Sequence, residues 1–231
     1  MSPLTPQELQ IIGLSLKVAL TATAFSLPPG IALAYLLSRY SFPGKALLSG
    51  LTHLPLILPP VVTGYALLLL FGRNGPLGSW LEPMGIVFAF DWTGAALAAA
   101  VMGFPLLVRA VSLSFDMIDP RIERAAETLG ATPLIRFVTI TLPLALPGIA
   151  AGAVLAFAKA LGEFGATITF VSSIPGETRT LPLAIYSLTQ VPGGEAAALR
   201  LVLISVAVSI GALLVSEWVA RTAARRIGRG A

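Results

Sequence analysis

Two titratable side chains, Lys159 and Glu163, stand inside a long apolar run and are the residues best placed to do chemistry in this sequence. They are four positions apart, so in a helix they share a face and can form an ion pair. A lone charge inside a membrane costs about 2.5–3.5 kcal/mol and is usually paired or faces a cavity. Two interpretations stay open. The pair either stabilises helix packing or belongs to the wall of a transport route, with Gly162, Glu163, Phe164 and Gly165 as a flexible constriction.

The remaining sequence offers little to a catalytic or metal site. The chain has no cysteine and one histidine, His53, so thiolate chemistry is excluded and ligands for a transition metal are too few. We interpret His53 as an interfacial hydrogen-bonding residue, with a ligand or proton-relay role as the alternative. The sequence has no GxxxxGK[ST] phosphate loop and no HExxH or GxSxG motif. We therefore expect no catalytic residue, no metal and no cofactor, and no ATP binding through a phosphate loop of its own.

The composition is that of an integral membrane protein. Hydrophobic residues make up 56% of the 231 residues and charged residues only 11%, with a mean hydropathy of +0.88. A soluble domain usually carries about a quarter charged residues. The net charge of +4 is typical of basic cytoplasmic loops in a membrane protein, so no nucleic-acid partner is expected. Met1 to Gln10 has no basic residue and so lacks the first region of a cleavable signal peptide.

Five apolar runs are each long enough to cross about 30 Å of hydrocarbon as helices. They predict an all-α protein, with a single transmembrane domain over residues 1–231 and spans at about 9–37, 47–71, 93–115, 144–171 and 196–220. Pro28-Pro29 predicts a kink or tilt in the first span, and Pro59-Pro60 a break in the second. Small residues at a spacing of four in the third and fourth runs favour close helix packing, with a pore wall as the alternative. Leu181 to Leu188 is too short to span and predicts an interfacial or partly re-entrant helix.

A charged segment, Asp119 to Pro143, separates the third and fourth runs and has clear helix signals. Asp119 can cap a helix that begins at Pro120, and Gly130 stands where a left-handed residue ends a helix. Thr132-Pro133 repeats the start signal, so a second short helix is predicted to run toward Pro143. The segment therefore predicts two short helices joined by a sharp turn, with an amphipathic loop on the bilayer surface as the alternative.

Basic residues fall mainly on one side of the predicted spans. Ten of them belong to that side: Arg39, Lys45, Arg109, Arg121, Arg124, Arg136, Arg221, Arg225, Arg226 and Arg229. Three belong to the other side: Arg73, Arg179 and Arg200. The positive-inside rule therefore predicts that residues 119–143 and the C-terminus are cytoplasmic and that the N-terminus is periplasmic.

The same segment resembles the "EAA" loop of ABC importer permeases. Ala125-Ala126, Gly130 and Ile140-Thr141-Leu142-Pro143 follow that family's pattern at its spacing. The resemblance implies that residues 119–143, hereafter the coupling segment, form coupling helices that dock in a cleft of a separate ATPase. In the family a Glu directly precedes the alanines, whereas Arg124 stands there in this chain and Glu123 lies one residue earlier. The coupling residues implied are Glu123, Arg124, Ala125, Ala126, Gly130, Ile140, Leu142 and Pro143. Whether Glu123 replaces the expected Glu stays open.

Further motifs extend the resemblance over nearly the whole chain. SFPGK from Ser41, HLPLILPPVVTGYALL from His53, LGEFGATITF from Leu161 and IPGETRTLP from Ile174 look like permease subunits of molybdate importers. Sulfate permeases are similar around Gly162 to Ala166, but they are generally longer by one span. The resemblance therefore implies a type I ABC importer permease for molybdate or tungstate, with a sulfate or thiosulfate permease as the alternative.

The resemblance also implies an assembly in the bacterial inner membrane. Five helices enclose too little for a route alone, so we expect a homodimer with the path at its two-fold axis. Two cytoplasmic ATPase subunits, which would bind the ATP, and a periplasmic molybdate-binding protein complete the expected importer, within membrane lipid. The alternative from another class is a stand-alone secondary anion transporter, which predicts internal repeats and several titratable residues at mid-membrane.

Overall fold

The computed structural model describes residues 4–228, with side chains described as far as Val215 and at Trp218. Every regular element in this range is helical, and the elements follow one another as α1 (Pro6–Arg39), α2 (Lys45–Ile57), α3 (Pro60–Phe71), α4 (Gly78–Leu81), η1 (Glu82–Met84), α5 (Trp92–Asp116), α6 (Pro120–Thr128), α7 (Pro133–Arg136), η2 (Phe137–Thr141), α8 (Leu142–Leu161), α9 (Gly165–Val171), α10 (Leu181–Thr189) and α11 (Glu195–Gly228). The tail arginines Arg221, Arg225, Arg226 and Arg229 lie outside the described side chains.

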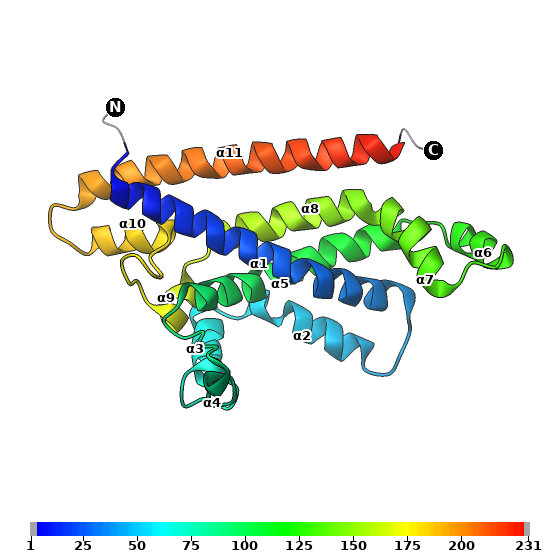
Figure 1. The fold of residues 1–231 in the computed structure, drawn as a ribbon, viewed down its shortest axis with the longest axis horizontal. Helices are drawn as coiled ribbons and strands as arrows, with labels where there is room; N and C mark the ends of the chain where they lie inside the picture. Colours follow the sequence, from blue (N-terminus) through cyan, green and yellow to red (C-terminus); the bar gives the residue numbers. More distant parts are fainter. Residues whose placement is uncertain (1–3, 229–231) are drawn as a thin grey trace.

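The long helices run along the length of the molecule (Figure 1). Helices α1, α5 and α11 point toward the end where α6 and α7 lie, and α8 points the other way. Helix α10 lies at the opposite end, beside the start of α1 and α11, and α9 lies nearby against α3 and α5. The coupling segment and the last turn of α11 are thus at the same end, as expected because two crossings, α8 and α11, separate them.

Four helical stretches are long and apolar enough to cross a membrane: Pro6–Arg39, Trp92–Asp116, Pro133–Leu161 and Glu195–Val215. A fifth crossing requires α2 and α3 together, and these are bent by 113° at a short break. The break predicted at Pro59-Pro60 is confirmed, because α2 ends at Ile57 and α3 begins at Pro60. Leu58 before the two prolines is extended, since a following proline disfavours the helical region. In the first span, α1 continues as one helix through Pro28 and Pro29.

The fourth run differs from its prediction at both ends. A single span over 144–171 is wrong, because α8 ends at Leu161 and a separate short helix, α9, begins at Gly165. The second short helix predicted in the coupling segment is not separate either: α7 continues through the π-helical turn η2 into α8. Pro143 lacks the N–H that an α-helix needs, and the π turn lies directly before it.

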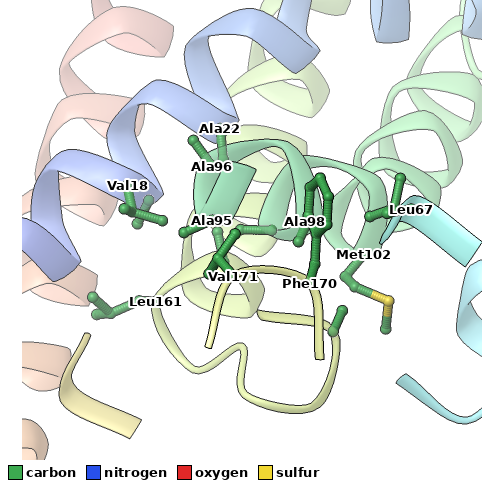
Figure 2. Close-up of a cluster of buried hydrophobic side chains, with 14 of the residues drawn as sticks. Val18, Ala22, Leu67, Ala95, Ala96, Ala98, Met102, Leu161, Phe170 and Val171 are labelled. Atoms are coloured by element: carbon green, nitrogen blue, oxygen red, sulfur yellow. The ribbon is translucent and has the colours of Figure 1, made fainter. Parts of the chain in front are cut away.

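The core is built where α5 packs against α1 and α8. Small side chains allow close approach, and Gly103 lies so near α8 that an added Cβ would stand 3.1 Å from the carbonyl oxygen of Ala156. The predicted packing role of the small residues is confirmed at this crossing. Figure 2 shows the cluster toward the α9 end of the molecule, in which Val18 and Ala22 of α1 meet alanines of α5 and Phe170 of α9.

Candidate functional site: the coupling segment and the break in the fourth run

The coupling segment has the local geometry that its sequence predicts at the turn. The carboxylate of Asp119 accepts a hydrogen bond from the backbone N–H of Arg121 at 2.8 Å and caps α6. Gly130 has φ +86°, a conformation that side chains with a Cβ rarely adopt. Thr132 accepts from the N–H of Ile135 at 3.4 Å and caps α7. The segment is therefore a shaped helix–turn–helix at one end of the molecule.

The exposed face of the segment is apolar at its centre and basic beside it. Leu129 at the turn is 88% exposed and Leu134 on α7 is 71% exposed. Arg124 and Ala125 on α6 are also exposed, whereas Ala126 is buried. Large apolar side chains in water at the end of a membrane protein indicate a surface that another protein covers.

Glu123 points the other way, into the molecule. Its residue is 9% exposed, and its Oε1 lies 3.2 Å from Nη2 of Arg39, at the end of α1. The same oxygen accepts a 2.8 Å hydrogen bond from the hydroxyl of Thr141, which is fully buried in η2. Glu123 is thus held by two other elements, and the charged residue presented on the outer face beside the alanines is Arg124.

The last residues of the motif anchor the segment to the helical bundle. Ile140, Leu142 and Pro143 are half-buried at the end of η2 and the start of α8. Leu142 packs on the buried cluster formed by α1, α5 and α8. These residues hold α7 and η2 against the helical bundle and are not part of the segment's exposed face.

The Lys159–Glu163 ion pair forms where α8 ends. Nζ of Lys159 lies 2.6 Å from Oε2 of Glu163, whose residue is only 3% exposed. The other carboxylate oxygen accepts from the N–H of Ala166 at 3.0 Å, so Glu163 also supports the first turn of α9. The pair predicted from the spacing is confirmed as a contact, and its carboxylate shapes the break between two helices.

The breaks in the second and fourth runs meet in space. A Cβ added to Gly165 would lie 2.7 Å from Cβ of Pro60, and one added to Gly64 would lie 2.4 Å from the carbonyl oxygen of Ala166. Phe164 lies against Tyr186 of α10, with ring centroids 5.0 Å apart, and Gly162 is exposed. The sequence did not predict this contact of α3 with α9. Its only signals were the prolines that break the second run and the glycines that break the fourth run.

His53 forms a local contact. Its Nδ1 lies 2.8 Å from the carbonyl oxygen of Ser49 one turn earlier, and the ring is half-buried on α2. Among the described side chains, which reach Val215 and include Trp218, no three of the kinds that bind metal ions gather at one point. The hydrogen bonding predicted for His53 is confirmed, and its interfacial position stays a prediction.

The structure is thus a bundle of apolar helices, at least four of them long enough to span a membrane, with a capped helix–turn–helix segment exposed at one end. Residues 26–228 match the family described as "Binding-protein-dependent transport system inner membrane component", and the chain belongs to that family. It is therefore a multi-pass component of the inner membrane.

The names of similar proteins indicate a narrower class of transport component than the family description does. The chain is 60% identical over 227 residues to the "Molybdenum transport system permease protein ModB" of Escherichia coli strain K12, covering 98% of this chain and 99% of the relative. It is 53% identical over 224 residues to the protein of that name from Haemophilus influenzae, covering 96% and 98% of the two chains. The "Sulfate transport system permease protein CysT" of E. coli K12 is more distant, at 39% identity over 78% of this chain and 65% of the relative.

Solved structures share the fold. A bacterial ABC transporter "involved in the import of the acidic polysaccharide alginate" superposes with a TM-score of 0.75 at 18% identity, covering 95% of this chain and 80% of that chain. "An amino acid ABC transporter with histidines" gives a TM-score of 0.64, covering 96% and 94%. The predicted fold class, an all-α permease of the type I ABC importer kind, is confirmed.

Proposed function

We propose that this chain is the permease subunit of an ATP-driven importer that carries molybdate, and its analogue tungstate, across the inner membrane. The observation that carries the substrate class is the 60% identity to a molybdenum permease protein over almost the full length of both chains. The sulfate permease relative matches less closely and over less of either chain. The chain itself is assigned no catalytic residue, metal or cofactor.

The coupling segment supports docking to a separate ATPase. Its exposed face combines apolar Leu129 and Leu134 with basic Arg124, and the turn at Gly130 keeps α6 and α7 at a fixed angle. An apolar centre with a charged rim is typical of a protein interface. Because the sequence has no phosphate loop, ATP is assigned to the partner.

We assign this face to the cytoplasm. The coupling segment lies at the end of the molecule toward which α11 runs (Figure 1), and near the end of the sequence come Arg221, Arg225, Arg226 and Arg229. Ten basic residues belong to this side and three to the other. The N-terminus is then periplasmic and the C-terminus cytoplasmic.

The transport cycle that fits this arrangement is a rigid-body one. Two copies of the chain surround the path, two ATPase subunits close on the coupling segments, and the attached spans rotate between two states. A periplasmic binding protein delivers the anion, so the path needs only weak and transient contacts. We assign part of the path wall to the break at Lys159, Gly162, Glu163, Phe164 and Gly165. Glu163 is neutralised there by Lys159, which lowers its repulsion of a passing dianion.

Reconstitution tests the proposal. Proteoliposomes would contain this chain with the ATPase and would receive the binding protein on the outer side. We expect uptake of labelled molybdate that requires ATP on the ATPase side and that unlabelled tungstate suppresses. Uptake that continues without ATP and without the ATPase would instead identify a secondary transporter.

Sulfate is the second candidate substrate, because the sulfate permease relative is 39% identical to this chain. Both anions are tetrahedral dianions, so the chemistry of a weak path need not separate them. Competition separates the two candidates. Strong suppression of molybdate uptake by sulfate would favour the sulfate permease, and suppression by tungstate alone would favour the molybdate permease.

A further inference from the structure

One carboxylate on helix α6, that of Glu123, makes polar contacts with both α1 and η2. Within the described residues, α6 has no extensive backbone contact with α1, α5 or α8. The side chain of Glu123 makes the connection. Its Oε1 lies 3.2 Å from Nη2 of Arg39 at the end of α1 and accepts a 2.8 Å hydrogen bond from the hydroxyl of Thr141 in η2. Both side chains of the ion pair are mostly shielded from water, at 15% and 11% exposed. A charged pair that is shielded in this way is costly to break, because each charge would be left without its partner.

Arg39 also attaches the end of α1 to the residue that directly precedes the coupling segment. Its Nη2 also donates to the carbonyl oxygen of Ile118, the residue directly before Asp119, at 3.4 Å. One guanidinium therefore contacts the entry of the segment and, through Glu123, its first helix. The ring of Tyr35, one turn earlier on α1, packs edge-on against Phe137 at the start of η2, with centroids 4.8 Å apart. The end of α1 thus touches the segment at its beginning, its first helix and its last turn.

Helix α1 is tied down again at its opposite end. The hydroxyl of Ser15 accepts from the N–H of Leu181, at the start of α10, at 2.7 Å. Glu8 forms an ion pair with Arg200 of α11 at 2.7 Å. Between these ends α1 is one continuous helix of 34 residues that packs along α5 and α8. A continuous helix with polar contacts at both ends can carry a displacement from one end to the other.

We propose that Glu123 is a positioning residue that fastens the coupling segment to α1, and that α1 carries the segment's movement to α10 and α11 at the periplasmic end. The inference rests on the proposed function, which supplies the ATPase that moves the segment. It assigns Glu123 an internal role in place of a contact with the ATPase. Arg124 is then the charged side chain that faces the ATPase at this point. The carboxylate of Glu123, which faces the helical bundle, transmits the movement.

Spin labels on the whole reconstituted complex test the transmission directly. The chain has no cysteine, so single cysteines at Thr128 on α6 and at Leu9 near the start of α1 report one site each. Distances between the two copies are measured without nucleotide and with ATP. In the parent protein we expect both distances to change. In E123A the Thr128 distance still changes, whereas the change at Leu9 falls to less than about half.

The matched control is Glu127, another α6 glutamate in an ion pair. It lies 3.1 Å from Arg136, whose side chain is 18% exposed, but the Glu127 carboxylate itself is 66% exposed, so E127A removes a charge that water largely screens. We expect E127A to keep both distance changes. A full change at Leu9 in E123A, or no change at Leu9 in the parent protein, would overturn the inference.

Transport measurements guard against a variant that merely folds badly. We expect E123A to lower molybdate uptake per ATP hydrolysed by about tenfold. The exchange R39E/E123R rebuilds the ion pair and should recover most of that loss, which a general packing defect would not allow. Failure of the exchange, together with normal uptake in E123Q, would contradict the inference. A parent protein that binds no ATPase would instead refute the proposed function.

Discussion

Among the side chains that the structure describes, the buried carboxylates are those of Glu123 and Glu163, and they are held in different ways. Glu163 pairs with Lys159 one helical turn away and caps the next short helix, so its partners all lie within a few residues. Glu123 pairs with Arg39 on α1 and with Thr141 in η2, so its partners come from other elements. The first carboxylate shapes a local break inside the membrane region, and the second joins separate helices at the end of the bundle. A stability defect is therefore expected at the break and a coupling defect at the segment.

The largest loss of stability is expected for Glu163→Leu. This change leaves Lys159 without a partner in an apolar region and removes the cap of α9. Breaking a buried pair typically costs about 3–5 kcal/mol, and Lys159 is 30% exposed, so we expect about 3 kcal/mol. Unfolding of the detergent-solubilised protein measures it. The double variant K159M/E163L should recover much of the loss. Equal stability of the single variant and the parent would show that the pair is not buried in solution.

A smaller loss is expected where the two breaks touch. Gly64→Val places a Cβ 2.4 Å from the carbonyl oxygen of Ala166, so α3 must move away from α9. Overpacking of this kind costs about 1–3 kcal/mol. Gly50→Ala on α2 is the matched control, because an added Cβ there meets no atom within 4 Å. The same unfolding assay compares the two. If Gly64→Val is as mild as Gly50→Ala, the close contact of α3 with α9 is refuted.

A substitution at the turn of the coupling segment should impair assembly with the ATPase but leave the folding of the spans intact. Gly130 has φ +86° and open space around it, so Gly130→Val strains only the backbone, at about 1–2 kcal/mol. We expect the spans to stay folded while ATPase binding and transport are lost. Gly130→Asn should retain binding better, because asparagine tolerates this conformation. Co-purification with the ATPase measures the effect, and normal binding by the valine variant would show that the turn angle does not matter.

The smallest effect on stability is expected for Leu129→Ser. Leu129 is 88% exposed, so the free energy of unfolding should change by no more than about 0.5 kcal/mol. If the ATPase covers this side chain, affinity should fall by more than about 1 kcal/mol, or roughly fivefold. A binding titration with the solubilised subunits measures it. Unchanged affinity would place the interface elsewhere on the segment.

The sequence predicts the features that depend on neighbouring residues. The helix caps at Asp119 and Thr132, the left-handed Gly130 and the break at Pro59-Pro60 all follow from local chemistry. The Lys159–Glu163 contact also follows, because a spacing of four fixes it on one helical face.

The missed features depend on which helices meet. Glu123 looks like any other charged residue on a short amphipathic helix until Arg39 and Thr141 are brought beside it. The run from Leu144 to Val171 is apolar enough to predict one span, and Gly162 and Gly165 beside Glu163 are its only sign that one helix ends and another begins there. Hydrophobicity predicts how long an apolar stretch is, and the packing of α9 against α3 decides where its helix stops.

Molybdate uptake into proteoliposomes is the most direct test of the proposed function. The vesicles would contain this chain and the ATPase, with the binding protein outside and ATP either present or absent on the ATPase side. We predict uptake that stops without ATP, stops with Gly130→Val, and is suppressed by tungstate more strongly than by sulfate. Uptake that proceeds at the same rate without ATP would contradict the account.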